Sequence, residues 1–428
     1  MIEILVPALL GSMLGAVAGL IPVVGTFASL LLVYPYLLDS SVAQILTFFV
    51  CLSSVSQFTG SVPALLLKIP GESSSLIAIK ESSNILKQNL AGEAIAITAL
   101  GSFFAGIGAM LFTYLFLGML DQFTATAFSN TVLTVLLLML IVLFCVNNTN
   151  TVAVNIVFIA SGLGLGLIGY NSLLSESILT FNNNDLRTGL PLYPVITGVF
   201  VVNEIIKGQY QYQNTELKIT SGLRHFNIFS WFRGTVIGYL GGFLPMAGKV
   251  IGTVVGYNVE QRFTDSSLRK LLNAESANNS AIISSLLPLL LFGIPITLGE
   301  ALIFDIIELK DFSFSVATSA GIFASIIPAI VVANFLGLIV AWPLAKQSLV
   351  IFRLDSKILF SAIVVILLIT NLYVGAINNQ MFYYLIVLIL SSCVGYALKK
   401  YDTFPFIFAF ILHDAIISNV YRFYLLNF

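Results

Sequence analysis

Apolar stretches long enough to cross a membrane recur along the whole chain and are separated by short polar loops. An α-helix needs about 20 apolar residues to span a hydrocarbon layer roughly 30 Å thick, so each such stretch predicts a transmembrane helix. We expect five of them in each half of the chain, near 43–70, 93–118, 129–146, 151–170 and 188–207, and near 276–304, 313–343, 358–375, 380–398 and 404–421. The pattern therefore predicts an all-α polytopic membrane protein.

Two glycine-rich segments, 4–38 and 227–258, stand apart from these stretches because they repeat each other. Four glycines and one proline recur 223 positions later, where Gly11, Gly15, Gly19, Pro22 and Gly25 correspond to Gly234, Gly238, Gly242, Pro245 and Gly248. A second set of prolines follows in the same order, since Pro63 and the Ile69-Pro70 step correspond to Pro288 and the Ile294-Pro295 step. The chain is therefore predicted to be a duplicated unit.

Loop charges indicate how the two copies are oriented, because basic residues gather on cytoplasmic loops. The loop around Asp39 has no Lys or Arg, whereas its partner at 262–270 has three. The difference in charge between the two loops reverses in the next pair, since the first-half loop at 72–90 contains two lysines and the second-half loop at 305–311 is acidic. The duplication is therefore predicted to be inverted, with a first repeat at 1–207, a cytoplasmic linker at 208–225 and a second repeat at 226–428.

The glycine-rich segments remain unassigned in this count of spans. Basic residues flank the second copy on both sides, so both of its ends should lie on one side of the membrane. We interpret both copies as re-entrant hairpins with tips near Pro22–Gly25 and Pro245–Gly248. Alternatively, the glycines are close-packing GxxxG-type faces of single spans, which would explain the glycines but not the prolines recurring in phase. The predicted fold is two inverted-topology repeats, each of about five transmembrane helices plus a re-entrant Gly/Pro hairpin.

Composition excludes a water-soluble protein and most catalytic chemistry. Hydrophobic residues make up 58% of the chain, charged residues 9%, and the mean hydropathy is +1.00. The first apolar stretch lacks the basic leader of a signal peptide, so we expect it to be retained. Cys51, Cys145 and Cys393 lie far apart, and His225 and His413 are the two histidines. We therefore expect no enzyme, no metal cluster and no cofactor other than a coupling ion, Na⁺ or H⁺.

The paired breaks indicate a transport site, because non-helical backbone at membrane depth must be buried in protein or line a polar cavity. Polar side chains accompany the breaks, and the free N–H groups of helix N-termini attract anions. We expect a carboxylate substrate to be bound by Pro22, Gly25, Thr26, Ser53, Ser54, Thr59, Gly60, Pro245, Gly248, Lys249, Asn278 and Asn279. Oxygen-bearing groups suit Na⁺, and we expect its site at Ser56, Asn279, Ser280, Gly293 and Thr297.

Four ionisable side chains near these segments are candidates for the site, and each also allows an interpretation without a role in binding. Lys249 follows the second tip and can pair with a substrate carboxylate or reach the cytoplasmic interface, to which Lys68 can also extend. Glu300 can hold a cation or proton, or make a structural hydrogen bond, and Glu275 can be simply an N-terminal helix charge. Any single Ser, Thr or Asn here can equally serve interhelical hydrogen bonding.

Several longer motifs resemble one known family. They are LIPVVG (20–25), TGSVPALLLKIPG (59–71), FLPMAG (243–248) and NAESANNSAIISSLLPLLLFGIP (273–295). In order and spacing they are similar to the large membrane subunit of the tripartite tricarboxylate transporters. The pattern departs at Val23, Met246 and Ile296, which stand where that family has glycine.

The resemblance implies a multi-pass permease of the bacterial inner membrane that moves an organic carboxylate with a cation gradient. It also implies two partners, a small four-helix membrane subunit and an extracytoplasmic solute-binding protein, and no nucleic acid. Two other functional classes stay open. A passive anion channel would conduct without cation coupling, and a membrane-embedded enzyme would need a convergent nucleophile and base. The sequence leaves open which carboxylate is moved and which ion drives it.

Overall fold

The chain folds into two compact units. Each unit combines one segment from the first half of the chain with one segment from the second half. The computed structural model describes residues 2–21, 25–67, 75–120, 138, 141–142, 150–171, 176–201, 223–244, 248–308, 310, 312, 316–351, 356–411, 413, 416–417 and 420–421. The first unit is Met1–Gln122 with Gln209–Ser356, and the second is Phe123–Gly208 with Lys357–Phe428. The predicted linker at 208–225 and the predicted span at 129–146 lie almost entirely outside the described residues.

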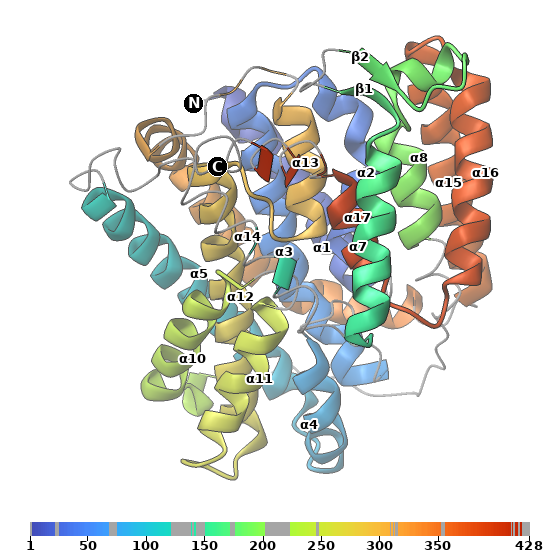
Figure 1. Ribbon diagram of the computed structural model, residues 1–428. Helices are drawn as coiled ribbons and strands as arrows, with labels where there is room; N and C mark the ends of the chain where they lie inside the picture. The colour runs from blue at the N-terminus through green and yellow to red at the C-terminus, as the bar shows by residue number, and fades with distance from the viewer. Residues whose placement is uncertain are drawn as a thin grey trace. The chain divides into compact units, whose positions relative to one another are not determined.

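The first unit contains two sets of helices in the same order (Figure 1). The first set is α1 (Ile2–Leu20), α2 (Gly25–Leu38), α3 (Val42–Leu67), α4 (Leu76–Lys87) and α5 (Ala91–Leu120). The second set is α10 (Ile228–Gly241), α11 (Gly248–Glu260), α12 (Ser267–Phe292), α13 (Leu298–Glu308) and α14 (Val316–Ile351). Each set thus has a broken helix pair, a long helix, a short helix and a second long helix.

The prediction of an all-α membrane protein is confirmed in outline, with corrections to individual spans. Four described helices, α1, α3, α5 and α14, are long and apolar enough to cross a membrane. Both glycine-rich segments are interrupted near their prolines, as predicted, between Leu20 and Gly25 and between Gly241 and Gly248. The single span predicted at 276–304 is wrong, because α12 ends at Phe292 and α13 begins at Leu298.

The glycines of α1 and α10 pack directly against the long helix that follows in each set. A Cβ atom at Gly11 or Gly15 would collide with the backbone carbonyl of Phe48 or Leu52 on α3, four residues apart on both helices. In the second set Gly234 and Gly238 face the backbone of Asn273 and Ala277 on α12 in the same register. The glycines therefore do form the close-packing faces of the alternative interpretation, and the breaks exist as well.

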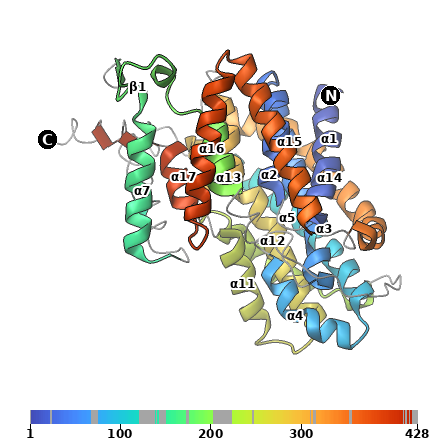
Figure 2. The ribbon, with the colours of Figure 1, turned by 90° about the vertical axis from the view of Figure 1, so that its right-hand side faces the viewer.

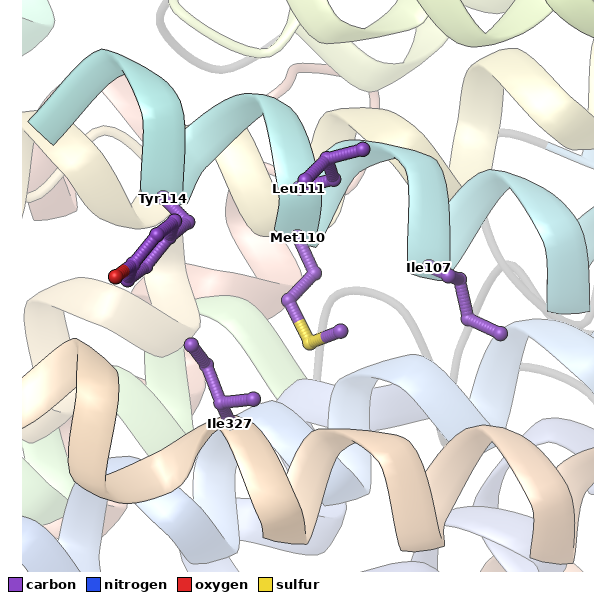
Figure 3. A pocket seen from close by; sticks show the side chains of 5 residues that line it. All are labelled: Ile107, Met110, Leu111, Tyr114 and Ile327. Carbon is purple, nitrogen blue, oxygen red and sulfur yellow. The ribbon is translucent and has the colours of Figure 1, made fainter. Parts of the chain in front are cut away.

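Equivalent long helices of the two sets run in opposite directions where they pack together. Gly106 of α5 faces Asn334 of α14, and the rings of Phe103 and Phe335 lie 5.0 Å apart between centroids. Further along α5, Met110 meets Ile327, which is earlier in α14. Here the two helices flank an apolar pocket of about 340 Å³, lined by Ile107, Met110, Leu111, Tyr114 and Ile327 (Figure 3). The described residues that line it include no charged side chain.

The second unit contains α7 (Val152–Gly166), α8 (Leu192–Ile196), α15 (Ser356–Ile377), α16 (Met381–Ala397) and α17 (Phe404–Ile411). A small antiparallel hairpin, β1 (Gly169–Asn171) with β2 (Glu176–Ile178), lies between α7 and α8 along the chain. Within the described part of the span predicted at 188–207, the helix begins only at Leu192, and α8 continues into a π-helical turn at Thr197–Val201. Ser391 of α16 donates to the carbonyl of Pro194 at 2.8 Å and holds α8 in place.

Candidate functional site

The polar stretches of the two long helices lie in continuous helix, not at interruptions. Pro63 and Pro288 are inside α3 and α12, which pass through them without ending. The interruption of the second set begins later, at Gly293, whose φ of 65° provides the left-handed turn that ends α12. The expectation that the polar side chains accompany the breaks, with Asn278 and Asn279 at the start of a broken segment, is therefore wrong for these two residues, since both lie mid-helix in α12. The equivalent first-half segment, which includes Lys68 and Pro70, is outside the described residues.

Helices α3 and α12 meet through their polar stretches. The amide Nδ2 of Asn278 donates to Oε1 of Gln57 at 2.6 Å, and both side chains are 1% exposed. Ser280 donates to the backbone oxygen of Thr235 on α10 at 2.7 Å, so the second hairpin joins the same region. The remaining predicted substrate residues of α3, which are Ser53, Ser54, Thr59 and Gly60, are buried in this part of the helix. The two polar stretches therefore contact each other within the first unit.

The first hairpin also reaches this region through its second helix. Gly25 has a φ of 54°, which suits the turn from the break into α2. The next residue, Thr26, lies 3.4 Å from Ser56 between hydroxyl oxygens and can donate to it. The start of α2 is therefore placed against the polar stretch of α3. Pro22 and Pro245, the predicted tip prolines, are outside the described residues.

Lys249 at the start of α11 is half-buried and lies near the carboxylate of Glu300, which its charge helps to stabilise. Glu300 accepts from Ser285 Oγ at 2.7 Å and from the backbone N–H groups of Ile296 and Thr297 at 2.9 and 3.0 Å. Thr297 in turn accepts from the Glu300 N–H at 3.2 Å, which completes a capping box at the start of α13. Glu300 therefore makes structural hydrogen bonds, as one of its two interpretations predicts. Gly293 and Thr297 shape the break between the helices.

Several buried polar atoms at the meeting point lack a protein partner. Among the described residues, the side chain of Asn279 finds no hydrogen-bond partner for its oxygen or its nitrogen. Oδ1 of Asn278 also has none. Both side chains are 1% exposed, so water does not satisfy them at the protein surface. An unsatisfied buried polar atom costs about 1–3 kcal/mol, and such atoms in a native protein call for an explanation. Binding of a small polar ligand at this place would supply one.

The ends of the hairpins are held by ion pairs that the sequence reasoning missed. Glu260 at the end of α11 is fully buried and accepts from Arg233 at 2.6 and 3.0 Å and from Ser230 at 2.6 Å. Arg269 of α12 also approaches it, at 3.4 Å. From the sequence, the basic residues around this segment served only as topology signals, and these pairs were not predicted. Here Arg233 and Arg269 join α10, α11 and α12 at the open end of the second hairpin.

A second buried carboxylate, Glu81, lies on α4, the helix that contacts α11 (Figure 2). Its Oε1 accepts from Tyr257 at 2.5 Å and pairs with Lys270 at 3.0 Å. Burial raises the pKa of Glu81, but the hydrogen bonds from Ser267, Tyr257 and Lys270 outweigh it, so the net pKa is lowered. Helix α4 is thereby fixed to the second set of helices.

The first hairpin carries the matching contact with exchanged partners. Tyr34 of α2 donates to Asp305 of α13 at 2.9 Å. Tyr34 and Tyr257 are 223 positions apart, and Glu81 and Asp305 are 224 apart. Each tyrosine therefore binds a carboxylate from the other half of the chain. The spacing of the repeat was the signal that could have revealed these two pairs.

Comparison with known proteins gives consistent matches. Residues 5–408 match the tripartite tricarboxylate transporter TctA family. An uncharacterized 52.8 kDa protein in the TAR-I ttuC' 3' region of Agrobacterium vitis is 27% identical over 373 residues, which is 83% of this chain and 74% of that protein. A second uncharacterized protein, from the TAR-II ttuC' 3' region of the same organism, is 28% identical over 197 residues, 43% of this chain and 80% of that protein. No solved structure matches the chain significantly. Because the family match covers nearly the whole sequence, the chain belongs to the tripartite tricarboxylate transporter TctA family.

Proposed function

We propose that the chain is the permease subunit of a secondary active transporter that couples entry of organic tricarboxylates or dicarboxylates to a cation gradient. One observation carries the proposal. The interrupted hairpin α1–α2 contacts the buried polar stretch of α3, and the interrupted hairpin α10–α11 contacts that of α12. Paired interrupted segments around a shared polar centre are the usual architecture of secondary transporter sites.

Inverted repeats and alternating access are part of this proposal. The opposite directions of α5 and α14 support the inversion, because these helices occupy equivalent places in the two sets. The exchanged contacts Tyr34–Asp305 and Tyr257–Glu81 support a two-fold relation between the sets. The repeats would be 1–207 and 226–428. Rocking of one hairpin at a time would then open the centre to either side of the membrane.

The substrate and the ion are assigned to the same polar centre. Thr26, Lys249 and the start of each second hairpin helix would hold the carboxylate, since the N-terminal end of a helix and a lysine both attract anions. Ser56, Asn279 and Ser280 would supply oxygen atoms to the cation, Na⁺ or H⁺. The buried amide atoms of Asn279 would gain partners when the site fills.

The partners follow from the family and are likewise proposed. A small four-helix membrane subunit and an extracytoplasmic solute-binding protein would complete the transporter in a bacterial inner membrane. The exposed apolar side chains on α1, including Met13 at 68% and Val17 at 48%, would face lipid or that subunit.

Uptake into proteoliposomes tests the function. The chain would be reconstituted with its membrane partner and offered a panel of labelled tricarboxylates and dicarboxylates, with an imposed Na⁺ gradient, a proton gradient or neither. We expect accumulation of at least one carboxylate only when a cation gradient is present. Equal flux without any gradient would indicate a channel and contradict the proposal, as would the absence of carboxylate uptake altogether.

A further inference from the structure

Glu275 is a buried carboxylate that the assignments above leave unused. It is 3% exposed and lies eight residues after Ser267, where α12 begins, so it is not an N-terminal helix charge. Its polar neighbours are Ser61 of α3 and Asn278, one turn further along α12. In the part of the chain that the structure describes, no Lys, Arg or His side chain lies within 4 Å of it.

Oxygen atoms without partners surround this carboxylate. Oε2 of Glu275, Oδ1 of Asn278 and Oδ1 of Asn279 are all buried and lack a hydrogen bond to any described residue. Residues three and four apart are neighbours on a helix surface, so Asn278 and Asn279 both adjoin Glu275. The other amide atom of Asn278 is already engaged by Gln57, which fixes the direction of its free oxygen.

A carboxylate buried without a counter-charge is strongly unfavourable unless it binds a cation or a proton. A proton would satisfy the carboxylate but would leave at least one of the two amide oxygens without a partner. A small alkali cation can bind all three oxygens at once, and one carboxylate balances one positive charge.

We propose that Glu275, with Asn278 and Asn279, binds the Na⁺ that drives transport. The inference rests on the proposed function and names the charged residue of its cation site. It also explains why these side chains lie where α3 and α12 meet. Ion binding there would tie the two long helices together, because Asn278 already bonds to Gln57 and Ser61 adjoins Glu275.

The test measures Na⁺ binding without substrate. The purified full-length protein would be heated in detergent at constant ionic strength, with NaCl, KCl or choline chloride as the salt. We expect Na⁺ to raise the unfolding temperature of the wild type in a saturable way and K⁺ to have no comparable effect. Glu275→Gln, which keeps the size of the side chain, should abolish the Na⁺ response. Asn279→Ala should shift the Na⁺ midpoint about tenfold upward, because it removes one ligand and keeps the charge.

Glu176→Gln is the matched control, since Glu176 is exposed on β2 and its loss removes the same charge. It should respond to Na⁺ as the wild type does. The proposal is overturned if Glu275→Gln keeps the Na⁺ response, or if the wild type shows none. Should Glu275→Gln fail to fold, an unchanged midpoint in Asn279→Ala would overturn it instead. This experiment uses no carboxylate substrate. A failure of substrate uptake in the proteoliposome experiment would therefore leave its result unaffected.

Discussion

Gly238→Ala should destabilise the protein, although alanine favours helix by about 1 kcal/mol over glycine. An added Cβ would collide with the backbone of Ala277, and backbone cannot rotate away as a side chain can. Real Cβ contacts fall near 3.4–4 Å, so α10 would have to move away from α12 by about an ångström. Overpacking of this kind costs about 1–3 kcal/mol, which exceeds the gain in helix propensity.

Thermal unfolding in detergent, followed by loss of the monodisperse fraction on size exclusion, would measure the effect. At roughly 2–4 °C per kcal/mol we expect the apparent unfolding temperature to fall by several degrees. Gly15→Ala should act in the same way, because Gly15 packs on the carbonyl of Leu52 in the other set. Gly321→Ala is the control, since Gly321 lies in α14 with no atom within 4 Å of an added Cβ. Wild-type stability in both packed variants, or an equal loss in the control, would refute the reasoning.

Three further experiments address the hairpins. Tyr257→Phe and Glu81→Gln should each lower the unfolding temperature at neutral pH. Since the pKa of Glu81 is lowered from 4.5, its contribution should be present above that pH and lost below it, and a stability difference between wild type and Glu81→Gln that persists in strong acid would contradict this. Cysteines placed at Ser40 and Ser266 should be labelled from opposite sides of the membrane if the repeats are inverted. Lys249→Met should weaken carboxylate uptake affinity by one to two decades, about the effect of losing a charge-assisted hydrogen bond, at matched expression; unchanged affinity would leave the helix N-termini as the anion site.

Much of the first unit was predictable because a single repeated pattern governs it. The 223-residue offset of the glycines and prolines locates both interruptions without any structure. Helix α4 was missed because its twelve residues mix apolar and charged positions and do not form a long apolar run. The interruption between α12 and α13 was indicated by the Ile294-Pro295 step but was not placed as the end of a helix. Ile294 and Ile296 are as apolar as the helices on either side, so the predicted span ran through them, and the turn depends on the conformation of Gly293.

The candidate site was predictable in composition but not in pairing. The polar residues near Gln57 and Asn278 stand out in an apolar chain, yet nothing local shows that they face each other across 221 positions. Loop charges misled in a different way. Arg233 looks like a solvated topology signal, whereas it is bonded to the buried carboxylate of Glu260. Pair formation of this kind depends on helix packing, which the linear pattern does not encode.

Satisfied and unsatisfied polar groups occur side by side in the first unit. At the hairpin ends Glu260 accepts from Arg233 and Ser230 with both of its oxygens, whereas Oε2 of Glu81 has no partner among the described residues. Where α3 and α12 meet, Asn279 has no partner among the described residues, although glycine faces clamp α10 tightly onto α12. Tight packing rules out simple looseness as the reason for the missing bonds. Unsatisfied polar atoms are costly in the hydrocarbon region, where there is no water, and this cost supports our proposal that a ligand binds where α3 and α12 meet.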